Sequence, residues 1–298
     1  MFVNKVDEIL THEGDVELWD FSKANISEES RINAITHIAS ICYQNPKALN
    51  SDSLYNRLMA ESIGLPSSSF ELCPILIKKG DLLNLTSRIE ELNMVKYGEW
   101  IKEGNVQYLI TNYRAVLYDK ETSNDTINLT KHFNTLEECE IISKHFTVMK
   151  FNVDSNTRTQ MIRHRVMWQE LSRRYVSGDK TPFEFYISEK MSNVVSRYIH
   201  TNKDGHTQAL DFTTEDIHNI CLNHYNFARE NYSIKPEEAR RIIPQSMKSI
   251  LWCGMYNRSL ENFLKLRTST KSQKEIRTVA INVNELLFRN NKFNIKIA

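Results

Sequence analysis

The chain has 298 residues, of which 41% are hydrophobic and 25% are charged, and its formal net charge at pH 7 is +1. This composition is typical of a globular protein and excludes a wholly disordered chain. The balanced charge also argues against a protein whose main partner is nucleic acid. No apolar run approaches the ~20 residues of a membrane span, and residues 1–10 lack the apolar stretch of a secretion signal. We therefore expect a cytoplasmic protein without a membrane segment.

Common cofactor signatures are missing from the sequence. The five cysteines form no C-x-x-C pair, and the nine histidines form no H-E-x-x-H motif, so we expect neither disulfides nor a metal site. There is also no phosphate loop and no G-x-G-x-x-G. If the chain binds a nucleotide, it binds it in another way.

Two helices are predicted near the N-terminus. Asn25 and Glu28 have the spacing of a capping box, and isoleucines recur at helical spacing after them, at Ile32, Ile35, Ile38 and Ile41. Residues 51–64 predict a second helix. A strand is then expected from about Phe70, where Pro74 suits a sheet edge.

Residues 78–144 are polar and irregular in pattern, so we expect an inserted subdomain within a single domain of residues 1–298. Residues 146–153 alternate as a strand does, and Asp154 can cap a following helix that carries Gln160, Arg163 and Arg165. Residues 183–188 predict another short strand. The C-terminal third is predicted to be mainly helical, with helices in residues 213–231, 236–244, 257–267 and 271–288. The expected fold class is α+β.

The densest charge lies in RHRVMWQELSRRY, from Arg163 to Tyr175. Several arginines in one place suit a phosphorylated small molecule, a nucleic acid or simply a solvated helix face. Apolar residues interleave with the arginines at i, i+4 spacing, for example Ile162 with Val166, which indicates partial burial. Glu170 and Ser172 add an acceptor and a hydroxyl, so a small-molecule pocket is favoured.

This stretch resembles the signature of the flavin-dependent thymidylate synthases, an R-H-R triplet followed by a spacer and Ser-x-Arg-Tyr. Further similarities follow in the family's order and cover residues 32–71 and 146–287: ICYQN, SSSFE, Gln160, EEARRIIP and NRSLENFLKLRTSTKSQKEIR. The resemblance implies an antiparallel sheet flanked by helices. It also implies reductive methylation of dUMP to dTMP with FAD as cofactor, NADPH and methylenetetrahydrofolate as co-substrates, and a homotetramer with pockets between subunits.

The resemblance implies two sets of site residues. Those expected to contact dUMP are Gln160, Arg163, Glu170, Ser172, Arg173, Arg174, Arg240 and Arg267. Those expected to bind FAD are Ser68, Glu71, Arg163, His164, Arg165, Glu170, Arg258 and Asn262.

Within these sets, Arg174 and Arg240 are the expected phosphate ligands, and Glu237 is expected to support Arg240. Arg267 is the expected catalytic residue, because a guanidinium beside the uracil would stabilise charge that develops on the ring. The alternative is that Arg267 caps the C-terminus of its own helix. Glu71 could instead hold an arginine of the motif.

The chain also departs from the family pattern. The spacer has six residues rather than seven, Pro66 and Leu72 replace two histidines, and Tyr256 stands where asparagine is common. These changes affect the carbon-donor side of the pocket. Hydroxymethylation or another C5 alkylation of a pyrimidine nucleotide therefore remains an alternative, as does a nucleic-acid-binding protein on a degenerate enzyme fold. Because the motifs lie outside residues 78–144, we expect removal of that segment to leave flavin binding intact.

Overall fold

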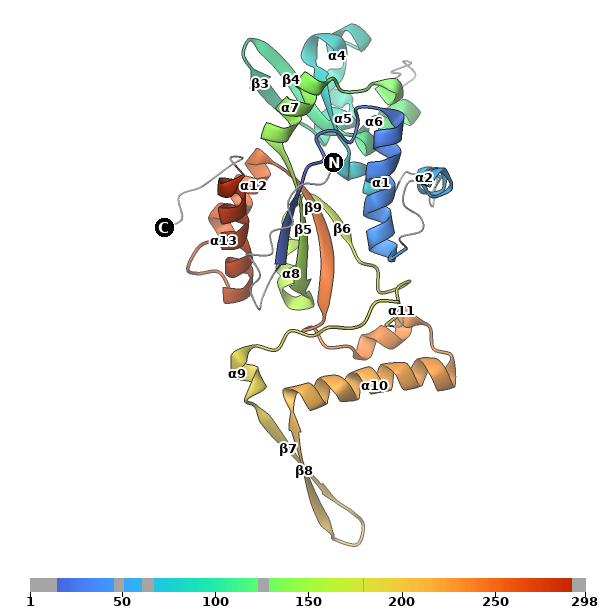
Figure 1. Cartoon of the computed structure of the whole chain (residues 1–298), viewed down its shortest axis with the longest axis vertical. Helices are drawn as coiled ribbons and strands as arrows, with labels where there is room; N and C mark the ends of the chain where they lie inside the picture. The colour runs from blue at the N-terminus through green and yellow to red at the C-terminus, as the bar shows by residue number, and fades with distance from the viewer. Residues whose placement is uncertain (1–14, 46–50, 61–66, 123–128, 179, 291–298) are drawn as a thin grey trace.

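The computed structural model describes residues 15–45, 51–60, 67–122, 129–178 and 180–290. The acidic N-terminal stretch, Pro66 and the expected end of the second helix near residue 64 lie outside these residues. The fold is α+β with antiparallel sheets, as predicted (Figure 1). None of the helices in the described ranges is long and apolar enough to cross a membrane.

A four-stranded antiparallel sheet forms the centre of the molecule, in the order β1-β5-β9-β6. Its strands are β1 (Asp15–Trp19), β5 (Phe146–Asp154), β6 (Met167–Glu170) and β9 (Lys248–Tyr256). β5 confirms a predicted strand. β9 was not predicted, since its apolar run is buried on both faces and has no alternation to reveal a strand. The two strands pair along their whole length, from Phe146 opposite Tyr256 to Asp154 opposite Lys248.

Two C-terminal helices cover one face of this sheet (Figure 1). They are α12 (Asn257–Arg267) and α13 (Lys274–Arg289), and both match predicted helices. The α13 face predicted to be apolar is fully buried: Ile276, Val279, Val283 and Leu286. They pack against alternate residues of the central strands, such as Phe151 and Cys253.

The other face is covered by an upper lobe and by α1 (Glu28–Tyr43), with α2 (Asp52–Met59) beside it. The upper lobe contains a second antiparallel sheet in the order β2-β4-β3, made of β2 (Pro74–Lys78), β3 (Glu99–Glu103) and β4 (Val106–Asn112). Around it lie the short helix η3 (Ser68–Leu72) and the helices α4 (Lys79–Leu85), η4 (Ile89–Glu91), α5 (Asn93–Lys96), α6 (Tyr113–Thr122), η5 (Leu129–Lys131) and α7 (Leu136–His145). Pro74 lies on an edge strand, as predicted, but Phe70 belongs to η3 and the strand begins later.

Residues 78–144 do not form a core of their own. Ile110 of β4 and Ile142 of α7 belong to one hydrophobic cluster with Ile38 of α1, Phe70 of η3 and Trp252 of β9. The expected boundary at residue 78 coincides with the last residue of β2, whose other residues are part of the same core. The segment therefore shares its hydrophobic core with α1, η3 and the central sheet.

A buried arginine ties α1 to the upper lobe. Arg31 donates hydrogen bonds to the backbone oxygens of Thr130, at 2.7 Å, and His132, at 2.9 Å, and its guanidinium lies 3.9 Å from the centre of the Tyr113 ring. Asn25, which was predicted to cap α1, instead accepts a hydrogen bond from Arg31 Nε at 2.7 Å. Ser27 caps the helix, because its hydroxyl accepts from Ser30 N at 3.1 Å.

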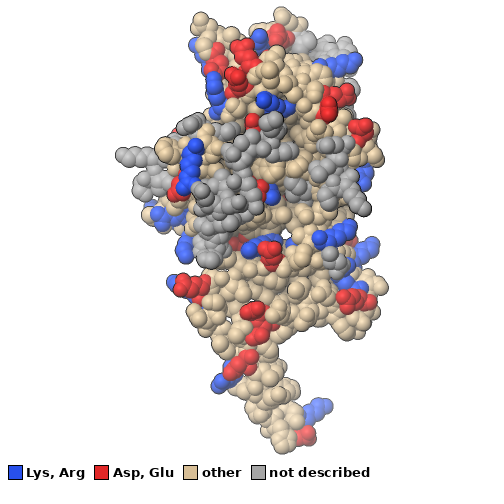
Figure 2. All heavy atoms as spheres, in the orientation of Figure 1, with Lys and Arg blue, Asp and Glu red and all other residues tan. Residues whose placement is uncertain are grey.

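A lower lobe follows β6 in sequence. It contains α9 (Glu189–Ser192), the hairpin of β7 (Val195–Thr201) and β8 (Thr207–Thr213), the long helix α10 (Thr214–Tyr232), α11 (Pro236–Ala239) and η6 (Arg240–Ile242). α10 confirms a predicted helix, and α11 with η6 forms most of the helix predicted for residues 236–244. Residues 183–188, predicted as a strand, form only an isolated bridge between Phe185 and Met247. The hairpin projects from the body (Figure 2), and every residue of β7 is exposed.

Candidate functional site

The R-H-R triplet lies at a change of direction between a helix and a strand. Asp154 caps α8 (Ser155–Met161) as predicted, and its carboxylate accepts from Asn156 N and Thr157 N, both at 2.8 Å. The predicted helix does not continue through Arg163 and Arg165. It ends at Met161, because the chain then turns and pairs as β6 with β9. The i, i+4 contacts expected in this stretch are therefore wrong, although the partial burial is confirmed.

The structure brings Gln160, His164 and Arg267 together from α8, the turn and the end of α12. Arg267 Nε donates to His164 Nε2 at 2.9 Å, and its Nη2 donates to the backbone oxygen of Gln160 at 3.0 Å. Gln160 belongs to the last turn of α8, where carbonyl groups lack partners within the helix. Arg267 thus binds the C-terminus of a neighbouring helix, which differs from the alternative that it caps its own.

His164 is a neutral acceptor in this arrangement. Burial and, to a smaller extent, the nearby charge of Arg267 lower the pKa of His164 to about 4. Its ring also packs edge-on against Phe263, with ring centres 5.1 Å apart. Because an uncharged imidazole can accept from Arg267 without repulsion, His164 fixes the direction of the guanidinium.

Arg163 supplies a second positive charge beside Arg267. Its side chain is exposed. Burial lowers the pKa of Arg267, and the charge of Arg163 lowers it further. Two neighbouring guanidinium groups repel each other unless an anionic or strongly polar ligand lies between them. Gln160, whose side-chain amide contacts Gln273 of the α12–α13 connection, lies at the same place. The site formed by Gln160, Arg163 and Arg267 is therefore suited to an electron-rich ligand.

The second part of the signature lies where β6 leads into the lower lobe. Arg174 is exposed and donates to Glu237 Oε2 at 3.3 Å. Glu237 was expected beside Arg240, but its carboxylate contacts Arg174. Arg240 begins η6 and is exposed as well. These two arginines are therefore accessible, as phosphate ligands must be.

Arg173 has different surroundings from Arg174. It is buried, donates to the backbone oxygens of Thr181 at 2.7 Å and Pro182 at 3.2 Å, and lies 4.5 Å above the Phe183 ring. These contacts hold the loop that follows Ser172. Glu170, also predicted to bind ligands, forms an ion pair with Arg158 of α8. Arg158 lies on the same helix as Gln160 and was not among the predicted site residues.

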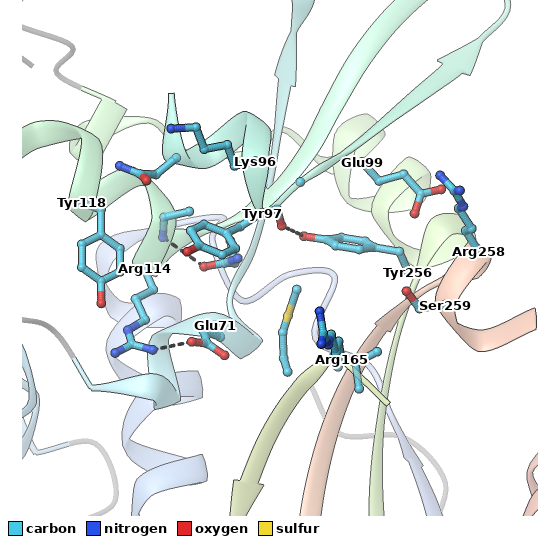
Figure 3. A pocket seen from close by; sticks show the side chains of 17 residues that line it. Glu71, Lys96, Tyr97, Glu99, Arg114, Tyr118, Arg165, Tyr256, Arg258 and Ser259 are labelled. Atoms are coloured by element: carbon cyan, nitrogen blue, oxygen red, sulfur yellow. Dashed lines mark hydrogen bonds and ion pairs between the residues drawn. The ribbon is translucent and has the colours of Figure 1, made fainter. Parts of the chain in front are cut away.

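A cavity of about 720 Å³ lies between the central sheet and the upper lobe (Figure 3). Its lower and right-hand walls include Glu71, Arg165 and Arg258, all of which were predicted to bind flavin. Ser68, at the start of η3, and the exposed Asn262, on α12, are not among its lining residues. The cavity is large enough for a drug-sized ligand.

The upper lobe supplies residues that the sequence analysis missed. Lys96, Glu99, Arg114 and Tyr118 all line the cavity. Glu71 does hold an arginine, but that arginine is Arg114 of α6 rather than one of the signature. These residues carry no family motif, so the charge of Lys96, Glu99 and Arg114 was the only available signal.

Two departures from the family pattern have structural explanations. Leu72 is buried against Gly254 of β9 so closely that a Cβ atom on Gly254 would lie 2.6 Å from Leu72 Cδ2. It therefore fills the core. Tyr256 reaches across the cavity and donates its hydroxyl hydrogen to the backbone oxygen of Tyr97 at 3.1 Å. Leu72 and Tyr256 thus both contribute to the close packing of the upper lobe against the central sheet.

The cavity residues suit an anionic cofactor such as FAD. Four lining side chains, Lys96, Arg114, Arg165 and Arg258, are cationic, against the carboxylates of Glu71 and Glu99. Burial raises the pKa of Glu99, which the charge of Arg258 opposes. Among the described residues, no group of three or more His, Cys, Asp or Glu side chains could hold a metal ion.

Comparisons with known proteins agree with the resemblance. A flavin-dependent thymidylate synthase of Aquifex aeolicus (strain VF5) is 30% identical over 132 residues, which is 43% of this chain and 41% of that protein. The enzyme of the same name from Clostridium tetani is 26% identical over 172 residues, or 56% of this chain and 66% of that protein. The matches thus span less than two thirds of either relative.

The chain is also similar to solved structures, of which two are examples. One is the flavin-dependent thymidylate synthase ThyX of Helicobacter pylori complexed with FAD and dUMP, with 19% identity and a TM-score of 0.35 over 60% of this chain and 87% of that chain. The other is the UMP/dUMP methylase PolB of Streptomyces cacaoi bound with 5-Br UMP, with 22% identity and a TM-score of 0.37 over 48% and 69%. The family model Thy1, thymidylate synthase complementing protein, matches residues 89–290, most of the chain. The chain therefore belongs to the thymidylate synthase complementing protein family, the family of the flavin-dependent thymidylate synthases.

Proposed function

We propose that this protein is a flavin-dependent thymidylate synthase that methylates dUMP at C5, with methylenetetrahydrofolate as carbon donor and NADPH as reductant. Family membership supports the proposal, and the observation that carries it is the convergence of Gln160, Arg163, His164 and Arg267. In this reaction C5 loses a proton and bonds to the methylene carbon, whose bonds to the folate nitrogens break to release tetrahydrofolate. The transferred carbon takes up a hydride equivalent to become a methyl group. Bound FAD would supply that hydride from NADPH.

Arg267 would activate the uracil. A guanidinium has five N–H groups, so the two hydrogen bonds to His164 and Gln160 leave donors that can reach the uracil oxygens. Negative charge develops on the ring as C5 attacks the carbon donor. Donors that already point at this charge stabilise the transition state without reorganisation.

Other residues would bind rather than activate. Arg174 and Arg240 are exposed arginines that can hold the dUMP phosphate, while Glu71, Arg165 and Arg258 would hold the cofactor. Ser172 would donate or accept a hydrogen bond to the nucleotide.

A nucleophilic role is disfavoured for Cys42, Cys73 and Cys253 by the burial of their thiols. Burial raises the pKa of Cys42 and of Cys73 to about 12, with the charge of Glu170 adding to the effect at Cys42. Burial also raises the pKa of Cys253 far above its ordinary value. A thiol in this state supplies almost no thiolate for attack at neutral pH. The arginine-rich site therefore supports a route in which the cofactor performs the redox chemistry.

The test begins with the absorption spectrum of the purified protein, which should show bound flavin. Incubation with dUMP, FAD, NADPH and methylenetetrahydrofolate should then give a product with the mass of dTMP, and omission of any one component should abolish it. A hydroxymethylated nucleotide would identify the alternative alkylation instead. A flavin-free protein that binds oligonucleotides with a steep dependence on salt would contradict the proposal.

We also propose that the enzyme is a homotetramer whose pockets combine residues of different subunits. The exposure of Arg163, Arg174 and Arg240 in the single chain supports this, because a second subunit could cover these side chains. Light scattering and activity should be measured over the same dilution series. A monomer that still turns over would contradict this assembly.

A further inference from the structure

The segment of residues 78–144 provides one wall of the cavity. Lys96 and Arg114 face it from the upper lobe, opposite Arg165 and Arg258 of the family motifs (Figure 3). Lys96 and Arg165 make no side-chain hydrogen bond or ion pair to any residue that the structure describes. The wall therefore carries positive charge that the protein itself does not fully neutralise.

Arg114 is held in place from two sides. Its guanidinium forms an ion pair with Glu71, and only 24% of its side chain is exposed. The guanidinium carbon also lies 5.5 Å from the centre of the Tyr118 ring. A planar fork with five N–H groups can bind Glu71 and a ligand oxyanion at the same time. Glu71 would thus position Arg114 for such a ligand.

We propose that Arg114, positioned by Glu71 and assisted by Lys96, forms a binding site for an anionic group of the cofactor or co-substrate. The site would take paired phosphate or carboxylate oxygens, which are found in the pyrophosphate of FAD and in the glutamate tail of the folate. This inference rests on the proposed function for the identity of the ligand, but not for the anion site itself. The segment of residues 78–144 would then bind a ligand in addition to forming part of the hydrophobic core.

The experiment compares the parent protein with Arg114→Gln, which keeps a hydrogen-bond donor toward Glu71 but removes the charge. Arg114→Lys restores the charge. Arg88→Gln is the matched control, since Arg88 lies in the same segment and pairs with Glu91 at the exposed surface. Circular dichroism melting of each variant establishes that it is folded. FAD is then titrated into flavin-free protein by fluorescence, and KM is measured for methylenetetrahydrofolate.

A lost charge-assisted contact should weaken binding about 10- to 100-fold. An increase in the Kd of FAD in Arg114→Gln alone would assign the site to the pyrophosphate, and an increase in the folate KM alone would assign it to the carboxylate tail. Arg114→Lys should recover most of either loss, and Arg88→Gln should change neither. If both constants of Arg114→Gln equal those of the parent, the inference is wrong.

Inorganic pyrophosphate separates this inference from the proposed function. It should raise the melting temperature of flavin-free parent protein and should have a smaller effect on Arg114→Gln. If the parent binds no flavin but shows this difference, the proposed function fails and the anion site stands. If neither pyrophosphate, FAD nor the folate binds the parent, both fail.

Discussion

Replacement of Arg267 by alanine should separate catalysis from substrate binding. The guanidinium makes two hydrogen bonds within the protein, to His164 Nε2 at 2.9 Å and to the oxygen of Gln160 at 3.0 Å. Its remaining N–H groups are the ones proposed to stabilise charge on the uracil. Loss of such donors typically costs about 2–4 kcal/mol in the transition state, or roughly 30- to 1000-fold in kcat. The KM for dUMP should change much less.

The same substitution has a structural cost that must be measured separately. Without Arg267, His164 Nε2 and the Gln160 carbonyl lose their donor, which should lower the free energy of unfolding by about 1–3 kcal/mol. Lys265→Ala is the matched control, because Lys265 lies on the same helix and forms only an exposed pair with Glu261. Arg267→Lys can restore one hydrogen bond but not the fork, and should recover only part of the rate.

The assay is steady-state dTMP formation with flavin content and melting temperature determined for each variant. A variant that has lost its flavin would show a low rate for another reason, so only flavin-loaded protein is compared. If flavin-loaded Arg267→Ala turns over within about threefold of the parent rate, less than 1 kcal/mol of barrier is involved. The activation role would then be refuted, and Arg267 would remain only the partner of α8.

Three further predictions follow from other contacts. Arg174→Ala should raise the KM for dUMP about 10- to 100-fold with little change in kcat, because a phosphate contact acts equally in ground and transition states; unchanged KM would refute the assignment. Burial lowers the pKa of His37 and of His164 to about 4 in the folded protein, from 6.5 in the unfolded chain. Between pH 4 and pH 6.5 the unfolded chain therefore binds more protons than the folded protein does. The melting temperature should therefore fall as pH drops from 6.5 toward 4, and His164→Gln should reduce this slope; an equal slope in both proteins would contradict the shift. Deletion of residues 80–140 should abolish soluble folded protein, since the segment is part of the common core; a folded, flavin-binding deletion product would restore the view that it is an insert.

Sequence patterns predicted the elements in which apolar and polar residues alternate, including β5, which is covered on both faces but keeps the polar Lys150 and Asn152 between its apolar residues. α13 alternates apolar and polar residues at helical spacing, and β5 alternates at strand spacing, so each was found with nearly correct ends. β9 was missed because both of its faces are covered, and its run of Leu251 to Met255 carries no periodicity. The turn after Met161 was missed because pairing with β9, which lies far along the chain, ends α8 there. Long-range pairing leaves no local signal.

Some residues of the candidate site could be predicted from the sequence, and others could not. Family motifs identified Arg267, His164 and Gln160, which the structure places in hydrogen-bonding contact. They could not identify Arg114, because its contact is with Glu71, a residue 43 positions away that folding brings to the same cavity. Nor could they separate Arg173 from Arg174, neighbours in sequence of which one is buried and the other exposed. Exposure of a side chain is decided by the loop that surrounds it.

The β7–β8 hairpin has a consequence for measuring the state of the protein in solution. A two-stranded ribbon exposed on both faces is marginally stable, so its backbone amides should exchange with deuterium much faster than those of β5 and β9. The tight turn from Asn202 to His206 should also be cut early by a protease. Exchange in the core strands β5 and β9 reports global unfolding. The ratio of the hairpin rate to the core rate therefore separates local opening of the hairpin from unfolding of the whole protein. Slower exchange in the ribbon at higher protein concentration would then record association of the chains, even when the contacting surfaces are unknown.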